Sequence, residues 1–154
     1  MNSIRILEAV RFAEKCHRGQ TRHGGEPYIT HPLAVAKLVS IKLELLEESF
    51  DEETKEDIII AALLHDVIED CDVGFEALRN LYGIKVARLV LNLSRNNSQE
   101  EYEQYIDRIL DAGKETLLIK EADLEHNCSQ IGKSSMVSRY LGSLKKIRKK
   151  REEK

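Results

Sequence analysis

The chain has 154 residues, 42% of them hydrophobic and 33% charged, a composition typical of folded globular proteins that excludes an intrinsically disordered chain. The formal net charge of −3 excludes a protein that binds nucleic acid through its overall charge, so any anion site must be local. The length predicts a single domain over residues 1–154 with one substantial core.

Cysteine usage and the apolar runs bear on the compartment. The 3 cysteines are odd in number and form no CxxC pair, which argues against a disulfide framework and for a reducing compartment. Residues 1–17 carry charges throughout and lack the apolar core of a signal peptide. No apolar run approaches the ~20 residues of a membrane span. We therefore predict a cytoplasmic protein with no membrane partner.

Apolar residues recur at helical spacing along most of the chain, and no segment alternates convincingly with the period of two expected of a strand. The first helix is predicted over residues 3–17, with Ser3 as its N-cap. The second is predicted from residue 30 to about residue 48, because Pro32 suits a first turn. The loop between these two helices contains glycines and basic residues.

A third helix is predicted to open at Asp51 and to continue without a break through Ile68. Its apolar run, residues 58–64, could also be a buried strand, but the whole segment is too long for an ordinary strand and contains two alanines. A polar loop is predicted at residues 94–99. Further helices are predicted over residues 74–82, 84–93, 100–112, 116–128 and 134–150. The sequence therefore predicts an all-α fold.

The end of the third predicted helix, LLHDVIED, carries one imidazole and three carboxylates. In a continuous helix His65 and Glu69 share one face, and Asp66 and Asp70 share the neighbouring face. Buried, unpaired carboxylates cost several kcal/mol each, roughly. A divalent cation bound between imidazole and carboxylates would offset this cost. The alternative is a solvent-exposed acidic helix end with a surface histidine.

Two distant segments strengthen the metal interpretation. His31 lies in PYITHP, just after the basic loop, and Asp123 lies in LLIKEADLEHN, after an apolar run. Taken singly, a histidine at such a position is more often a cap or a core residue, and such an aspartate is usually solvated. Together with His65 and Asp66 they make two histidines and two aspartates. This set suits a borderline-to-hard metal with open positions for water.

The order H…HD…D, carried by HRGQTRHGGEPYITHP, AALLHDVIED and IKEADLEHN, resembles that of the HD-domain phosphohydrolases. It is most similar to the hydrolase domain of the Rel/SpoT alarmone enzymes and their small stand-alone relatives, over roughly residues 3–127. The resemblance implies an HD-domain helical bundle with a buried metal site and one manganese ion per chain. It also implies removal of the 3′-pyrophosphate from guanosine tetra- or pentaphosphate.

Matched position by position, the resemblance implies roles for individual residues. The metal ligands would be His31, His65, Asp66 and Asp123. The attacking water would be prepared by Glu69 and Asp70. The substrate would be bound by Arg22, His23, Asn127 and Tyr140. We also expect Arg18 to line the mouth of the pocket beside Arg22 and His23.

Two other functions remain open from the sequence. One is an HD phosphohydrolase that acts on another phosphate ester, such as a nucleotide monophosphate, NADPH or the pyrophosphorylated end of a tRNA. The basic segment LKKIRKKREEK could contact RNA in that case, although a solvated helix end that complements the helix dipole is the simpler interpretation. The other is a catalytically silent module that binds a metal or nucleotide. The complete set of histidines and acidic residues argues against such a module.

Overall fold

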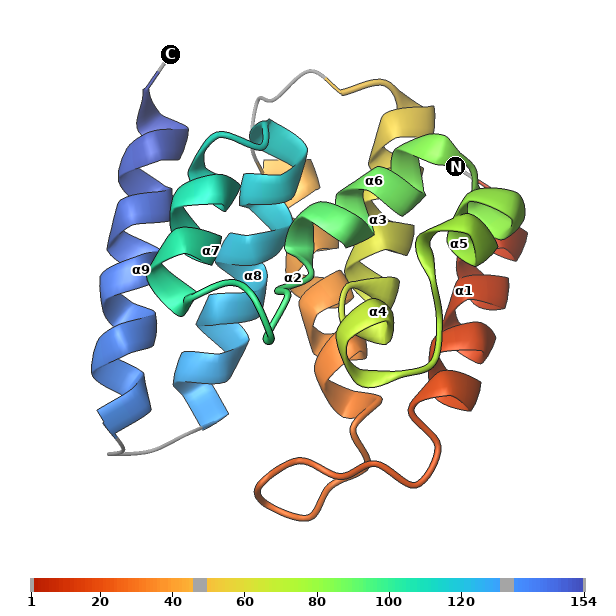
Figure 1. The fold of residues 1–154 in the computed structure, drawn as a ribbon. Helices are drawn as coiled ribbons and strands as arrows, with labels where there is room; N and C mark the ends of the chain where they lie inside the picture. Colours follow the sequence, from red (N-terminus) through yellow and green to blue (C-terminus); the bar gives the residue numbers. More distant parts are fainter. Residues whose placement is uncertain (1, 46–49, 131–134, 154) are drawn as a thin grey trace.

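The computed structural model describes residues 2–45, 50–130 and 135–153, which form helices joined by loops (Figure 1). The helices are α1 (Ser3–Cys16), α2 (Thr30–Leu45), α3 (Glu52–Leu64), α4 (Val67–Asp70), α5 (Phe75–Tyr82), α6 (Ile84–Leu93), α7 (Tyr102–Leu110), α8 (Lys114–Gln130) and α9 (Ser135–Glu152). Within the described ranges the only β-structure is an isolated bridge between Thr21 and Pro27, so the predicted all-α fold is confirmed. No helix in these ranges combines the length and apolar character needed to cross a membrane.

Helix α3 lies inside the larger core and packs against α1, α2 and α6. Every residue of α3 from Glu56 to Leu64 is buried. A helix buried on all sides has no polar stripe, which is why the run 58–64 lacks helical periodicity. Helix α8 also packs against α2 and carries α7 and α9 on its other side (Figure 1). The packing of α2, α3 and α8 therefore fixes the relative positions of the three motif segments.

The helix starts follow from local capping. The carboxylate of Asp51 accepts a hydrogen bond of 2.7 Å from the Thr54 N–H, so α3 opens where the sequence predicted. The N-cap of α1 is Asn2 and not Ser3, because the Asn2 side chain accepts from the Ile4 N–H at 3.1 Å. The predicted end of the second helix near residue 48 and the predicted start of the last helix at residue 134 lie outside the described residues.

The third predicted helix is interrupted, and the prediction of an unbroken helix through Ile68 is wrong. Helix α3 ends at Leu64 and α4 begins at Val67. Asp66, with φ −100° and ψ −3°, is the N-cap of α4, and its carbonyl accepts the Asp70 N–H at 2.9 Å to start a new turn. Consecutive side chains of a regular helix point about 100° apart. Because the helix is interrupted here, the side chains of His65 and Asp66 can point toward the same region.

The buried position of α3 can be tested by truncation. Ile60 is 0% exposed, and Ile60→Ala is expected to lower the free energy of unfolding by about 2–5 kcal/mol, because the cavity would be only partly filled by its neighbours. Urea denaturation followed by circular dichroism measures the loss. Leu91→Ala on α6 is the control, since Leu91 is 46% exposed and its truncation should cost about 0.5 kcal/mol or less. Equal losses in the two variants would contradict the placement of α3 in the core.

Candidate functional site

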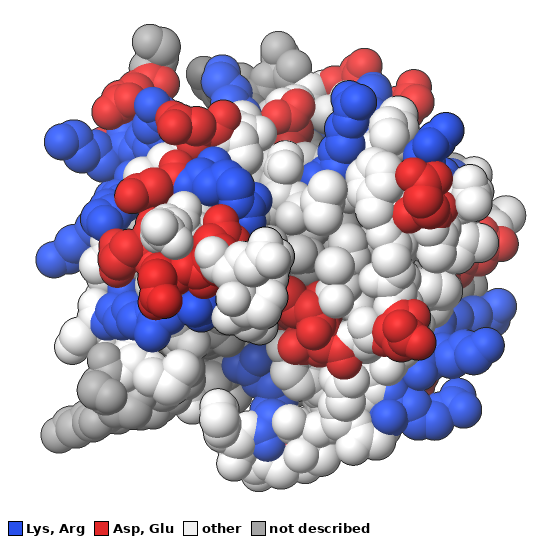
Figure 2. All heavy atoms as spheres, viewed as in Figure 1, with Lys and Arg blue, Asp and Glu red and all other residues white. Residues whose placement is uncertain are grey.

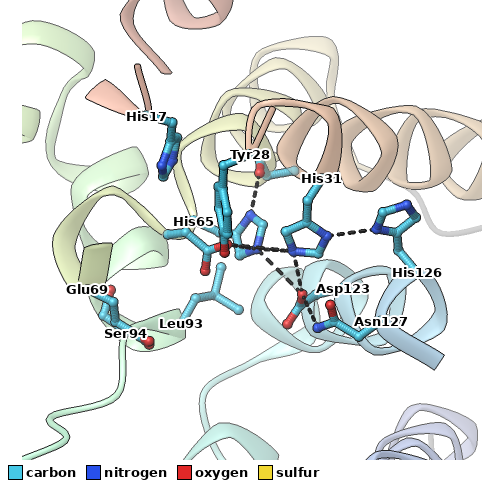
Figure 3. Close-up of polar contacts among 12 residues, drawn as sticks. His17, Tyr28, His31, His65, Glu69, Leu93, Ser94, Asp123, His126 and Asn127 are labelled. Carbon is cyan, nitrogen blue, oxygen red and sulfur yellow. Dashed lines mark hydrogen bonds and ion pairs between the residues drawn. The ribbon is translucent and has the colours of Figure 1, made fainter. Parts of the chain in front are cut away.

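Two imidazoles and two carboxylates converge where α2, the α3–α4 junction and α8 meet (Figure 3). The Nε2 atom of His31 lies 3.2 Å from Nε2 of His65 and 3.0 Å from Oδ1 of Asp123. The Oδ2 atom of Asp66 lies 3.1 Å from Nε2 of His65 and 3.6 Å from Nε2 of His31. Asp123 Oδ1 also lies 3.5 Å from Nε2 of His65. The structure thus brings together the four residues that were predicted from the sequence to be metal ligands.

Both imidazoles are held through their Nδ1 atoms, so that Nε2 faces the cluster. His65 donates from Nδ1 to the carbonyl of Ala62 at 2.7 Å. The Nδ1 of His31 lies 2.7 Å from Nδ1 of His126. Burial and the adjacent His31 lower the pKa of His126 to about 4, so His126 is neutral and can accept a hydrogen bond from His31. Metal-binding histidines are commonly oriented by such a partner on the second nitrogen.

The carboxylates favour positive charge at the cluster. Burial opposes a charge on His65, but Asp66 and Asp123 outweigh it and hold the pKa of His65 well above its usual value. Burial likewise opposes the ionised form of Asp66, yet His65 holds its pKa below the usual range. For Asp123 burial is outweighed first by the ammonium of Lys120, which keeps the pKa of this carboxyl well below its usual value. Both carboxyl groups are therefore ionised at neutral pH.

This donor set fits a divalent metal ion. Imidazole nitrogens combined with carboxylate oxygens suit borderline ions. Bonds of about 2.0–2.3 Å would separate neighbouring donor atoms by about 3 Å. The observed separations between the imidazole nitrogens and the carboxylate oxygens run from 3.0 to 3.6 Å. The donor atoms of His31, His65 and Asp66 all lie within 4.8 Å of one another. Both the spacing of the donor atoms and their chemistry therefore fit a divalent metal ion.

Asp123 is held by two neighbours on its own helix. Lys120 donates from Nζ to Oδ2 of Asp123 at 2.7 Å, and Asn127 donates from Nδ2 to Oδ1 at 3.0 Å. The carbonyl oxygen of the Asn127 side chain accepts in turn from Arg22 at 3.0 Å. Arg22 and Asn127, both predicted to bind substrate, thus form a contact that reaches the cluster. Lys120 was missed by the sequence reasoning, and its only signal is its position one turn before Asp123.

The acidic residues of α4 have different surroundings. Figure 3 shows Glu69 beside Ser94, away from the imidazoles, and its carboxylate accepts the backbone N–H of Arg95. Loss of water around this carboxylate raises the pKa of Glu69 to about 7. Burial also raises the pKa of Asp70 above its usual value. A carboxyl group with a pKa near neutrality is suited to proton transfer. The catalytic roles of both residues remain predictions.

Tyr28 lies between the basic loop and the cluster. Its hydroxyl donates to Oδ2 of Asp66 at 2.7 Å, and its ring lies edge-on to His31 with the ring centroids 6.0 Å apart. Burial, and then the charge of Asp66, raise the pKa of Tyr28, so the hydroxyl keeps its proton. Tyr28 therefore satisfies an oxygen of Asp66 from the side of the loop. The sequence reasoning gave this residue no role.

A pocket of about 680 Å³ opens from the cluster. Figure 2 shows a hollow in the lower middle of this face, with acidic and basic side chains on either side of it. The predicted substrate-binding residues Arg22, His23, Asn127 and Tyr140 all line the pocket, together with Glu69 and Asp70. Its lining also includes residues that the sequence reasoning did not nominate, among them Arg95, Asn97, Tyr102, Tyr105 and Arg139.

The predicted position of Arg18 is wrong. Arg18 is exposed, and it is absent from the lining of this pocket. It lies two residues after the end of α1, and the next residue is Gly19, whose φ of +83° belongs to a turn that glycine favours. The basic side chains that reach the pocket from this loop therefore come after the turn, at Arg22 and His23.

Comparison with known proteins identifies the family of this chain. A family model described as HD domain matches residues 9–125. The bifunctional (p)ppGpp synthase/hydrolase SpoT of Escherichia coli (strain K12) is 38% identical over 137 residues, covering 83% of this chain and 18% of that protein. The chain thus spans less than a fifth of the length of that relative.

Two shorter relatives match more of their length. The guanosine-3′,5′-bis(diphosphate) 3′-pyrophosphohydrolase of Danio rerio is 35% identical over 134 residues, covering 83% of this chain and 69% of that protein. A solved structure, described as a metazoan orthologue of SpoT that hydrolyses ppGpp, matches with a TM-score of 0.79 and 27% identity. The match covers 99% of this chain and 88% of the other. This chain belongs to the HD-domain family.

Proposed function

We propose that the protein is a metal-dependent pyrophosphohydrolase that removes the 3′-pyrophosphate from guanosine tetra- or pentaphosphate or a related nucleotide. The observation that carries the proposal is the convergence of His31, His65, Asp66 and Asp123 at a pocket that also contains basic side chains. The names of the relatives from Danio rerio and Escherichia coli support the choice of substrate.

The same proposal extends to organisation and location. Residues 1–154 would form a single HD hydrolase domain, supported by the contacts of α2 and α3 with α8 across the motif segments. Cys16, Cys71 and Cys128 are all free thiols, which supports a cytoplasmic location. The proposed ion is Mn²⁺, one per chain, held by the two histidines and two aspartates of the cluster.

The residues of the chain would divide the reaction between them. A divalent cation supplies Lewis acidity, which polarises a phosphoryl group and makes water easier to ionise. Arg22 and His23 would hold the phosphates. Arg22 suits this role because its guanidinium donates paired charge-assisted hydrogen bonds to phosphate oxygens. Glu69 and Asp70 would orient the water and take its proton as it attacks phosphorus. Attack would be on the phosphorus bonded to the 3′-oxygen. The bond between them breaks, pyrophosphate is released, and the 3′-oxygen takes up the proton removed from the water to become the 3′-hydroxyl.

The basic C-terminal segment does not favour RNA as a partner. Arg148 on α9 pairs with Glu121 at 3.3 Å and with Glu125 at 3.0 Å, and Arg151 also pairs with Glu121. Lys146 pairs with Glu103 of α7 at 3.0 Å. Three basic side chains of LKKIRKKREEK are therefore paired with acidic residues of α7 and α8. These ion pairs connect α9 to α7 and α8, and we propose no nucleic-acid partner for this segment.

The proposed reaction makes a defined product. With Mn²⁺, the protein is expected to convert guanosine tetraphosphate into GDP and pyrophosphate, resolved by anion-exchange chromatography. Asp66→Ala should abolish turnover and weaken Mn²⁺ binding measured by calorimetry, because the site loses one charged donor. Arg18→Gln, at an exposed position outside the pocket, is the matched control and should retain both. Release of single phosphates, or turnover that persists in EDTA, would contradict the proposal.

Glu69→Gln tests the proposed proton acceptor, since it keeps the size of the side chain but cannot take a proton. We expect kcat to fall roughly 10²–10⁴-fold with Mn²⁺ affinity unchanged. A base works only when ionised, so the wild-type kcat/KM should rise with pH and level off as Glu69 ionises. Its pKa is about 7 in the metal-free chain and would be lowered by a nearby cation, so the midpoint of the rise should lie at or below about pH 7.

The variant should lose that rise with pH. Calorimetric titration with Mn²⁺ separates the two roles of a carboxylate at this position. If Glu69→Gln binds no Mn²⁺, Glu69 is a metal ligand and not a base. If its turnover equals that of the wild type at every pH, the proton goes elsewhere and our assignment fails.

A further inference from the structure

Tyr102 is flanked by two arginines that come from different parts of the chain. Tyr102 begins α7, Arg95 lies in the loop after α6, and Arg139 lies on α9. The guanidinium carbon of Arg139 is 3.6 Å from the centroid of the Tyr102 ring, and that of Arg95 is 5.9 Å away. These are cation–π distances, and the shorter one corresponds to direct stacking. All three residues line the pocket that opens from the His–Asp cluster.

Neither guanidinium forms an ion pair with a carboxylate in the part of the chain that the structure describes. Arg95 donates from Nε to the backbone carbonyl of Glu100 at 3.1 Å, and the carboxylate of Glu100 is itself paired with Arg108 at 2.8 Å. Arg148, on the same helix as Arg139, shows the contrast, because it contacts two glutamates. The pocket wall therefore carries two arginine charges without an acidic partner.

Two such charges around one ring repel each other, and an anion between them would relieve the repulsion. The planar guanidinium matches the oxygens of a phosphate group, and stacking on an aromatic ring leaves its N–H groups free to donate. The pocket volume of about 680 Å³ falls in the range of small-molecule sites, so a nucleotide could contact both this wall and the His–Asp cluster.

We propose that Arg95 and Arg139, held by the ring of Tyr102, form a second phosphate subsite that binds a substrate phosphate group that is not cleaved. The inference rests on the proposed function, in which the 3′-pyrophosphate lies at the His–Asp cluster. The group at the second subsite is then the 5′-diphosphate. The subsite makes the protein selective for nucleotides phosphorylated on both sides of the ribose.

The kinetic test compares two substrates. One is guanosine 3′,5′-bis(diphosphate), and the other is guanosine 3′-diphosphate with a free 5′-hydroxyl. Arg139→Gln and Arg95→Gln should each raise the KM for the bis(diphosphate) by about tenfold or more beyond any rise in the KM for the 3′-diphosphate. This is the effect expected when a hydrogen bond to a charged group is lost. Lys149→Gln removes one positive charge from an exposed position on α9 outside the pocket and is the matched control. It should leave the ratio of the two KM values as in the wild type.

A binding test separates this inference from the proposed reaction. Calorimetry with GDP needs no 3′ group and no turnover, and Arg139→Gln should weaken GDP binding by about tenfold or more. Arg139→Lys keeps the charge but loses the paired donors, so its GDP affinity should lie between those of the wild type and Arg139→Gln. Thermal unfolding of each variant shows whether the fold is intact.

The outcomes are distinct. If the wild type cleaves neither substrate but binds GDP through Arg139, the proposed function fails and the subsite stands. If the wild type cleaves the bis(diphosphate) and both arginine variants keep the wild-type KM ratio and GDP affinity, the subsite is refuted and the function stands. If Lys149→Gln causes the same loss as Arg139→Gln, the effect is one of general charge and the subsite is also refuted.

Discussion

The contact of Asp123 with both imidazoles is the constraint on which the rest of the site depends. Its Oδ1 atom lies 3.0 Å from Nε2 of His31 and 3.5 Å from Nε2 of His65, inside a region where all three residues are buried. A buried carboxylate is costly unless every oxygen is satisfied. Lys120 and Asn127 supply the remaining contacts from the same helix. Because the donors come from α2, the α3–α4 junction and α8, the cluster exists only when these helices pack together.

Asp66 and Glu69 lie in one short segment, but their pKa values are shifted in opposite directions. The pKa of Asp66 is held down by His65, whereas the pKa of Glu69 is raised to about 7 by loss of water. One carboxylate is therefore ionised at neutral pH, and the other can exchange a proton near neutral pH. Their separation arises from the end of α3, since α4 carries Glu69 toward the loop at Ser94 and Arg95 and away from the imidazoles. Geometry and electrostatics thus give different chemistry to residues three positions apart.

Much of the fold could be predicted, because apolar spacing and the caps are local properties. Asp51 capped α3 as expected, and the run 58–64 was correctly assigned to a buried helix by its length. The break after Leu64 could not be predicted in this way, because LLHDVIED contains neither glycine nor proline, the residues that reliably end a helix. It depends on contacts made across the fold, such as the hydrogen bond from Tyr28 to Asp66. Local propensity is a weak guide where tertiary contacts of this kind decide the backbone.

The candidate site shows the same division. His31, His65, Asp66 and Asp123 could be grouped from the sequence because their motifs are long and ordered. Arg95, Tyr102 and Arg139 belong to no motif, and their shared ring contact appears only when α6, α7 and α9 are assembled. Likewise, the net charge of −3 does not predict a pocket that has both acidic and cationic regions. In the proposed reaction the motif residues would specify where a phosphate is attacked, and residues outside the motifs would decide what else the nucleotide must carry. On this proposal, substrate preference could change in this fold without any change in the four residues of the His–Asp cluster.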